Sequence, residues 1–152
     1  MPAREFFVHR LHQMLWVEER LADELLPRCS EQVGATDLKV GIERHQLETK
    51  QHVLTVRTIL NQLGQKQHAI ESPVLLALEA DFGETDLHIA DLLAKGEHFE
   101  IAAYTTLRSL ANALGEEDIS IRLTEILEQE EYALELVHRA TAKFLAETVE
   151  TA

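Results

Sequence analysis

Apolar residues recur every three or four positions over long stretches of this chain, which is the spacing of one face of an α-helix. This periodicity predicts long helices over residues 5–26, 36–63, 86–114 and 117–148, and a short helix over 74–82. No stretch of useful length alternates between apolar and polar residues as a β-strand would. The sequence therefore predicts an all-α fold.

Glycine and proline residues mark the expected helix ends. Pro27 follows the first helix, because a proline disrupts a helix interior. Gly64, Gly83 and Gly115 follow three of the other helices, where glycine commonly ends a helix. Expected N-terminal caps are Thr36-Asp37 and Ser72-Pro73.

The lengths of the connections predict the topology. Short loops after the first and third long helices make each of these helices antiparallel to the next, and about twenty residues join the two pairs. This arrangement is typical of a four-helix bundle with one long crossover, here carrying the short extra helix. We expect residues 1–152 to form a single domain.

The predicted buried stripe of each long helix is interrupted near its middle by carboxylates or a histidine. Glu100 and Glu130 are both fifteen residues from Gly115, so they should lie at one level, and a turn near Val33 would bring Glu18 level with about residue 48. We therefore expect side chains from four helices to meet in one layer. The candidates are Glu18, His45, Glu48, Glu97, Glu100 and Glu130.

Such a layer needs a compensating positive charge. Moving a carboxylate out of water costs several kcal/mol, and packed leucines would cost less. A pair of bound cations supplies the charge most simply. Oxygen-rich donors with an imidazole from His45 favour iron or manganese over tetrahedral zinc. His45 and Glu48 are three residues apart, which places both on one helix face.

Several alternatives remain open from the residues alone. Each glutamate taken singly is more typical of a solvated face, and a shift of one residue would put Glu19 or Glu131 in the layer. His52 shares the face of His45, and it could either hydrogen-bond a metal ligand from outside the ligand set or simply pack in the core. Tyr104 fits either a hydrogen bond to a ligand, electron transfer, or core packing.

Gly96 and the remaining histidines also have informative positions in the predicted helices. Gly96 precedes Glu97 inside a predicted helix, and a local bulge or a close helix approach would explain it. The remaining histidines show no paired spacing on a buried stripe, which favours surface positions for His9, His12, His68, His88, His98 and His138.

Composition removes several classes of function. The chain has 14 Lys and Arg against 27 Asp and Glu, a formal charge of −13, so nucleic acid and anionic membranes are disfavoured partners. The single cysteine excludes an intrachain disulfide and a cysteine metal cage. There is no long apolar run and no signal-peptide pattern, so we expect a cytoplasmic location.

Four segments of the chain carry a recognisable pattern: Val17–Leu21, His45–Thr49, Glu97–Leu107 and Glu128–Glu130. They resemble the YciF-like branch of ferritin-like stress proteins, and the similarity covers nearly the whole chain. The resemblance implies a ferritin-like bundle with a rubrerythrin-type dinuclear metal centre, a homodimer and a role in general stress. Carried over by position, the six candidates above correspond to the family's expected ligands.

Two positions depart from the family pattern. The family usually has an acidic residue four positions after the glutamate of the last helix, where this chain has Leu134. One metal position would then lose a ligand, unless Glu131 and Glu135 serve in place of Glu130. His52 stands where the family often has glutamine and would compensate in part.

Three hypotheses of function follow. The first is a non-haem protein with two iron or manganese ions, acting on peroxide or dioxygen as a peroxidase or oxidase would. The second is a non-enzymatic, stress-associated structural or interaction bundle with a vestigial metal site. The third is a ferritin-style storage cage. No Cys-x-x-Cys pair is present, so electrons would come from a separate donor.

Overall fold

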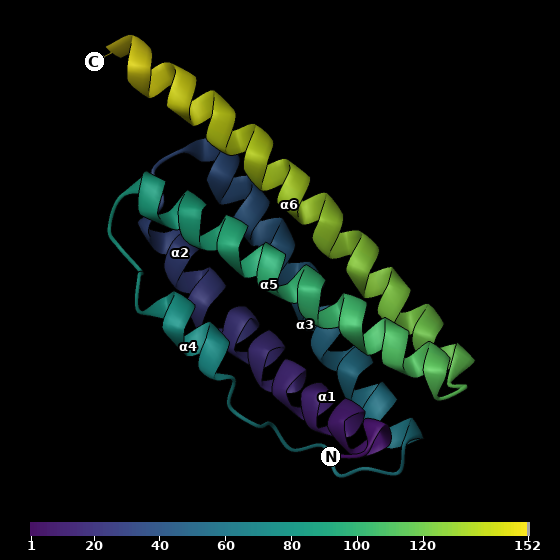
Figure 1. Cartoon of the computed structure of the whole chain (residues 1–152). Coiled ribbons are helices and arrows are strands. Elements are labelled where there is room, and N and C mark those ends of the chain that lie inside the picture. The colour runs from purple at the N-terminus through teal and green to yellow at the C-terminus, as the bar shows by residue number, and fades with distance from the viewer. Residues whose placement is uncertain (152) are drawn as a thin grey trace.

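A computed structural model describes residues 1–151, with side chains for residues 1–149, and shows a bundle of helices in which one long connection joins α3 (Thr36–Gln62) to α4 (Pro73–Glu79) (Figure 1). The described residues contain no β-strand, which confirms the all-α prediction. The elements are α1 (Ala3–Arg20), η1 (Leu21–Leu25), α2 (Leu26–Gln32), α3 (Thr36–Gln62), α4 (Pro73–Glu79), α5 (Asp86–Ala113) and α6 (Glu117–Thr151).

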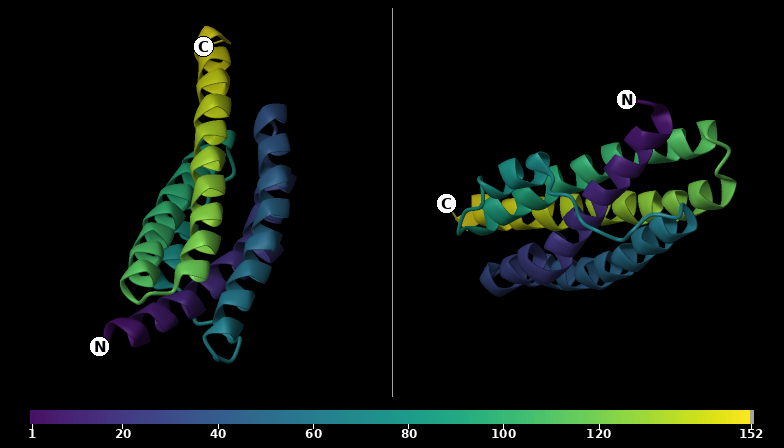
Figure 2. Two further views of the ribbon diagram at one scale, coloured as in Figure 1. Left: turned by 90° about the vertical axis from the view of Figure 1, so that its right-hand side faces the viewer. Right: turned by 90° about the horizontal axis from the view of Figure 1, so that it is seen from below.

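The four long helices surround one core, and each packs against two others. Helix α1 packs on α3 and α5, and α6 packs on the same two helices (Figure 2). The connection from α3 to α5 carries α4, which lies against α5 and buries Leu75. The predicted four-helix bundle with one long crossover is therefore confirmed.

The crossover is tied to α1 by hydrogen bonds. The backbone N–H of Ile70 donates to the carbonyl of His12 at 3.1 Å, and His12 Nδ1 lies 2.7 Å from the carbonyl oxygen of His68. The rings of His12 and His68 stack with centroids 4.0 Å apart. His12 is buried, so its predicted surface position is wrong, because the crossover covers this part of α1.

The first helix was expected to end before Pro27, and this prediction is wrong. It continues through the π-helical turn η1 into α2, which ends at Gln32. Pro27 has no N–H, so it donates nothing to the carbonyl of Ala22 five residues earlier. The side-chain amide of Gln46 on α3 donates to that carbonyl at 3.0 Å. A bond from the neighbouring helix thus replaces the one that proline cannot make.

The cap predicted for α3 is also different. The N-cap residue is Ala35, and no side chain of α3 caps the helix. Instead, Asp86 at the start of α5 accepts hydrogen bonds from the backbone N–H groups of Gly34 and Ala35, at 2.9 and 2.8 Å. This carboxylate joins the α2–α3 turn to α5. Ser72 precedes Pro73 as expected but makes no side-chain cap, and α4 ends at Glu79, before the predicted residue 82.

The core contains a central layer of buried polar side chains, described below, with apolar side chains on both sides of it. One end of the core includes Phe7, Ile59 and Leu107, and the other includes Cys29 and Ile89. Burial raises the pKa of the Cys29 thiol to about 12. The left-handed turns predicted after α3 and α5 are present, with φ of 71° at Gly64 and 75° at Gly115. No helix among the described residues is long and apolar enough to cross a membrane.

We expect Gln46→Ala to lower the free energy of unfolding by about 1 kcal/mol, because the Ala22 carbonyl loses its donor. Urea unfolding measures the change. Gln51→Ala, at an exposed position of the same helix, is the control. In a Pro27→Ala background the Gln46→Ala effect should shrink, and an undiminished effect there would refute the proposed link to proline.

Candidate metal centre

Six charged or titratable side chains are buried together in the middle of the bundle. Each of them is 7% exposed or less, although none of these residue types is commonly buried without a partner. Every long helix contributes at least one, as the interrupted stripes predicted. They are Glu18 on α1, His45 and His52 on α3, Glu97 and Glu100 on α5, and Glu130 on α6.

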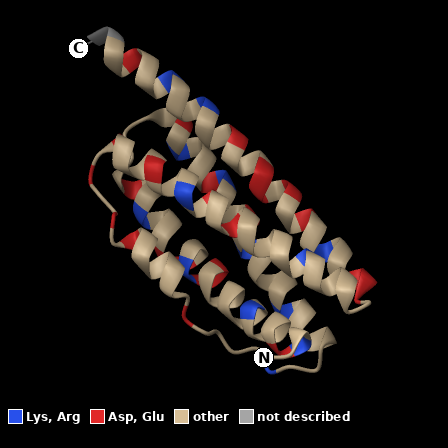
Figure 3. Cartoon of the chain, in the orientation of Figure 1, with Lys and Arg blue, Asp and Glu red and all other residues tan. Residues whose placement is uncertain are grey.

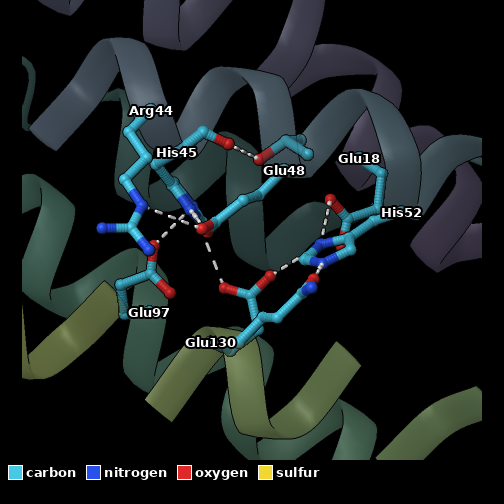
Figure 4. Close-up of polar contacts among 9 residues, drawn as sticks. Glu18, Arg44, His45, Glu48, His52, Glu97 and Glu130 are labelled. Carbon is cyan, nitrogen blue, oxygen red and sulfur yellow. Dashed lines mark hydrogen bonds and ion pairs between the residues drawn. The ribbon is translucent and has the colours of Figure 1, made fainter. Parts of the chain in front are cut away.

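The donor atoms fall into two groups that share one carboxylate. The first group consists of His45, Glu97, Glu100 and Glu130, and the second of Glu18, His52 and Glu130. Within each group, one ligand-type atom per residue lies within 4.8 Å of the others. Figure 4 shows Glu130 between the two histidines, with His45 and Glu97 on one side and His52 and Glu18 on the other.

Short contacts hold the layer together. His45 Nε2 is 2.6 Å from Glu97 Oε1 and 3.8 Å from Glu130 Oε2. His52 Nδ1 is 2.9 Å from Glu130 Oε1 and 3.7 Å from Glu18 Oε2. Both oxygens of Glu130 therefore face an imidazole, one from each donor group.

Many donor atoms in this layer have no hydrogen bond of normal geometry, despite these short distances. They are five carboxylate oxygens, one each of Glu18, Glu97 and Glu100 and both of Glu130, and one nitrogen of each histidine, of which His45 Nδ1 faces Glu48 at the edge of the layer. Buried polar atoms in folded proteins are nearly always hydrogen-bonded, so unpaired carboxylate oxygens gathered in one layer need a cationic partner. Carboxylate oxygens and imidazole nitrogens are the donors preferred by iron and manganese. The residues present therefore fit a metal site.

Charge leads to the same conclusion. The four buried carboxylates would carry a charge of −4, and two protonated imidazoles would neutralise half of it. Two divalent cations with neutral imidazoles would balance it completely. Without metal, protons must do so. Burial and then the charge of Glu130 raise the pKa of Glu100 well above its usual value.

The two histidines are shifted toward the charged form. Burial alone would lower their pKa values, but the neighbouring carboxylates outweigh it. The charge of Glu97 and the contact with Glu48 raise the pKa of His45 well above its ordinary value. Contacts with Glu130 and Glu18 raise the pKa of His52 to about 11. Each imidazole therefore acts as a counter-ion in the metal-free layer.

Of the six residues predicted as ligands, Glu48 is placed differently from the rest. It lies half-buried at the edge of the layer, with Oε1 3.3 Å from Arg44 and Oε2 3.7 Å from His45 Nδ1. The contact with His45 lowers the pKa of Glu48, against the effect of burial. The structure brings the other five together and adds His52 to them.

The predicted level of Glu18 was wrong by about one helical turn. Glu18 faces His52, not residue 48. Part of the reason is that the first helix continues to Gln32, so the turn before α3 is centred on Gly34, one residue later than Val33, which moves the residue level with Glu18 about half of the way from 48 to 52. The spacing of His52 from His45, two turns along one face, was the signal available in the sequence.

The choice between neighbouring glutamates is clear in the structure. Glu131 is exposed, Glu135 pairs with Arg139 at the surface, and Glu19 pairs with Arg57. Glu130 and Glu18 face the interior instead. Figure 3 marks acidic positions on every long helix, so burial, and not acidity alone, distinguishes the candidates.

Two residues outside the donor groups fix the orientation of donors. Tyr104 is fully buried, and its hydroxyl donates to Glu18 Oε1 at 2.6 Å, so it hydrogen-bonds a candidate ligand. His52 Nε2 lies 2.6 Å from Gln129 Oε1, which directs Nδ1 toward the layer.

Gly96 marks neither a bulge nor a close approach, because α5 is continuous there and no atom lies within 4 Å of a Cβ at this position.

The fold is that of a ferritin-like helical bundle. The chain belongs to the family described as a domain of unknown function, DUF892, which it matches over residues 2–150. Similar solved structures include the Escherichia coli stress protein YciF and YcfI from Rhodopseudomonas palustris, so the resemblance to the YciF-like family is confirmed.

The structural matches extend over most of each chain. YcfI has a TM-score of 0.85 at 28% identity, covering 91% of this chain and 94% of that one. YciF has a TM-score of 0.84 at 21% identity with the same coverage. A dodecameric thioferritin from Bacteroides fragilis, a bacterioferritin-related protein, has a TM-score of 0.78 at 16% identity, covering 99% and 92%. Among curated proteins, none matches the sequence.

The metal-free protein should lose stability as the pH rises. Burial and the charge of Glu97 raise the pKa of Glu130 to about 8, above its ordinary 4.5, so the folded state retains a proton that the unfolded state has released. Its stabilising contribution is complete below pH 4.5 and is lost as the pH rises through about 8. The contribution of His52 is lost later, between 6.5 and about 11.

Urea unfolding with a chelator present, at pH values of about 6 and about 8.5, measures this loss. The Glu130→Gln variant should show a smaller difference between the two pH values, because the amide does not titrate. A wild-type stability that rises over this interval relative to the variant would contradict the assignment.

Proposed function

We propose that this protein is a non-haem dinuclear iron or manganese protein that reacts with peroxide or dioxygen, in a stress-related role. The observation that carries the proposal is the set of buried, unpaired donor atoms converging from four helices. A bundle selected only for stability would fill this layer with leucine, since unpaired buried carboxylates are costly. The stress-related role is supported by the name of its structural neighbour, the stress protein YciF.

One metal position would be formed by His45, Glu97, Glu100 and Glu130, and the other by Glu18, His52 and Glu130. When bound, two divalent ions supply one electron each for reduction of a peroxide O–O bond, which also takes up two protons and releases two molecules of water from hydrogen peroxide. His52 supports the second position, where Leu134 provides no donor.

The protein's own groups have distinct parts in this proposal. Glu130 contacts both histidines and would connect the two positions. Tyr104 holds Glu18 through its hydroxyl, and Gln129 holds His52. Glu48 stands at the edge of the layer beside Arg44, where it would meet solvent and incoming ligands. The apolar layers on either side keep bulk water away from the donors.

A second candidate is a non-enzymatic bundle with a vestigial site. It is favoured by the direct contacts of His45 with Glu97 and of His52 with Glu130, which let the layer close on protons alone. In that case the buried charges only cost stability, and Glu100→Leu or Glu130→Leu should make the protein more stable. In the dinuclear protein the same changes remove metal-dependent stabilisation.

We expect about two iron or manganese ions per chain after reconstitution, and the loss of at least one in Glu100→Ala and Glu130→Ala. Elemental analysis gives the metal content, and thermal unfolding with and without metal gives the stabilisation. Glu131→Ala is a matched control, since it removes the exposed neighbour of Glu130. The loaded wild-type protein should consume hydrogen peroxide, and both buried-site variants should do so more slowly.

A wild-type protein that stays metal-free after anaerobic iron or manganese reconstitution would refute the dinuclear proposal. Equal metal content in Glu130→Ala and Glu131→Ala would refute the assignment of Glu130. Metal binding without peroxide or dioxygen consumption would leave a metal-binding bundle and remove the redox part of the proposal.

The homodimer implied by the resemblance stays a prediction. Light scattering on the purified protein should give twice the mass of one chain. A much larger particle would instead favour the storage cage, the assembly class that the dodecameric thioferritin represents among the structural neighbours.

A further inference from the structure

A groove of about 430 Å³ lies between α3 and α6 and opens from the candidate metal centre. His45, Glu48 and Glu97 line one end of it. The groove is therefore continuous with the edge of the layer where an incoming molecule would meet the donors. Its walls are mostly apolar and are formed by Leu38, Ile42, Leu93, Ala133, Val137 and Ala140.

Side chains from α3 and α6 bridge the groove. At the end away from the metal centre, Lys143 Nζ lies 2.6 Å from Asp37 Oδ2. Near the metal centre, the Arg44 guanidinium lies 5.0 Å from the centre of the Tyr132 ring. These contacts join the same two helices at the two ends of the apolar walls, and the volume of the groove between them is in the range that holds small organic ligands.

Gly41 adds a second observation. It lies in the groove wall, inside the long helix α3, where glycine weakens a helix relative to alanine. No atom lies within 4 Å of a Cβ placed on Gly41, so packing does not require glycine there. The space that a side chain would occupy at this position is part of the groove instead.

The groove is larger and more apolar than hydrogen peroxide would need, since that molecule is little larger than water. A ligand that fits it has a hydrocarbon part for the walls and a polar end for His45 and Glu97. We propose that the groove binds the hydrocarbon part of an organic hydroperoxide and directs its –OOH group to the metal centre. This inference rests on the proposed function, because the site supplies the reason for a peroxide at the polar end.

Binding is tested without turnover by titrating the metal-free protein with 2-phenylpropan-2-ol, the alcohol that corresponds to cumene hydroperoxide. Calorimetry should show saturable binding to the wild type. Gly41→Phe and Ala140→Phe fill the groove from opposite walls, so each should weaken binding about tenfold or more. Leu54→Phe adds a ring at an exposed position of α3 outside the groove and should bind as the wild type does.

The iron-loaded wild type provides a second measurement. In a single turnover, in which the two Fe(II) ions would supply the two electrons that reduce the –OOH group to an alcohol and water, its second-order rate constant should be about tenfold higher for cumene hydroperoxide than for tert-butyl hydroperoxide, whose hydrocarbon part leaves most of the groove empty. Circular dichroism and urea unfolding establish that each variant is folded, and the two variants of opposite walls keep the test valid if one of them is not.

The inference is overturned if 2-phenylpropan-2-ol does not bind the wild type, or binds both filled variants equally well. It is also overturned if either filled variant instead changes the particle mass in light scattering, because the groove would then be an interface between copies of the chain. If the wild type consumes hydrogen peroxide but does not bind the alcohol, the groove proposal is refuted and the proposed function stands. If it binds the alcohol but consumes no peroxide, the proposed function is refuted.

Discussion

The structure depends on balancing the charge of four carboxylates that are buried in the middle of a helical bundle. Glu18, Glu97, Glu100 and Glu130 lie where a bundle of this kind usually has aliphatic side chains. Among the described side chains, the groups in the layer that can carry a positive charge are the two histidines, and the neighbouring carboxylates raise the pKa values of both. Protons and metal ions are therefore alternatives for the same positions, and each helix must hold its donor at a fixed level.

The contacts that fix these levels lie outside the layer. Asp86 ties the turn before α3 to the start of α5, and the crossover binds the backbone of α1 at His12. Gln46 completes the hydrogen bonding of the first helix beside Pro27 and so holds α3 against it, one residue from His45. Each of these polar bonds joins segments distant in the sequence. They set the register of neighbouring helices more specifically than interchangeable aliphatic packing does.

The helices, and the burial of Glu18, His45, Glu97, Glu100 and Glu130 in one layer, could be predicted from the sequence because both depend on helical periodicity. The long crossover could be predicted from the lengths of the connections. Glu100 and Glu130 could be placed at one level because a glycine turn separates them symmetrically. The continuation through Pro27 could not be predicted, since it depends on a donor supplied by Gln46 of another helix. That continuation places the turn before α3 one residue later than expected, which contributes to His52, and not Glu48, facing Glu18: the level of a side chain depends on where its helix ends.

The sulfur atoms of this chain bear on its chemical durability. The chain has one cysteine and two methionines, and Cys29 and Met14 are both buried in the core. Peroxides react with the thiolate form of cysteine, and a pKa of about 12 leaves Cys29 almost wholly as the thiol at neutral pH. Of the three sulfur-containing side chains, only that of Met1 is exposed. The folded bundle thus presents an oxidant with one exposed sulfur atom, whereas unfolding would uncover both buried sulfurs, so the protection of Cys29 and Met14 lasts as long as the fold.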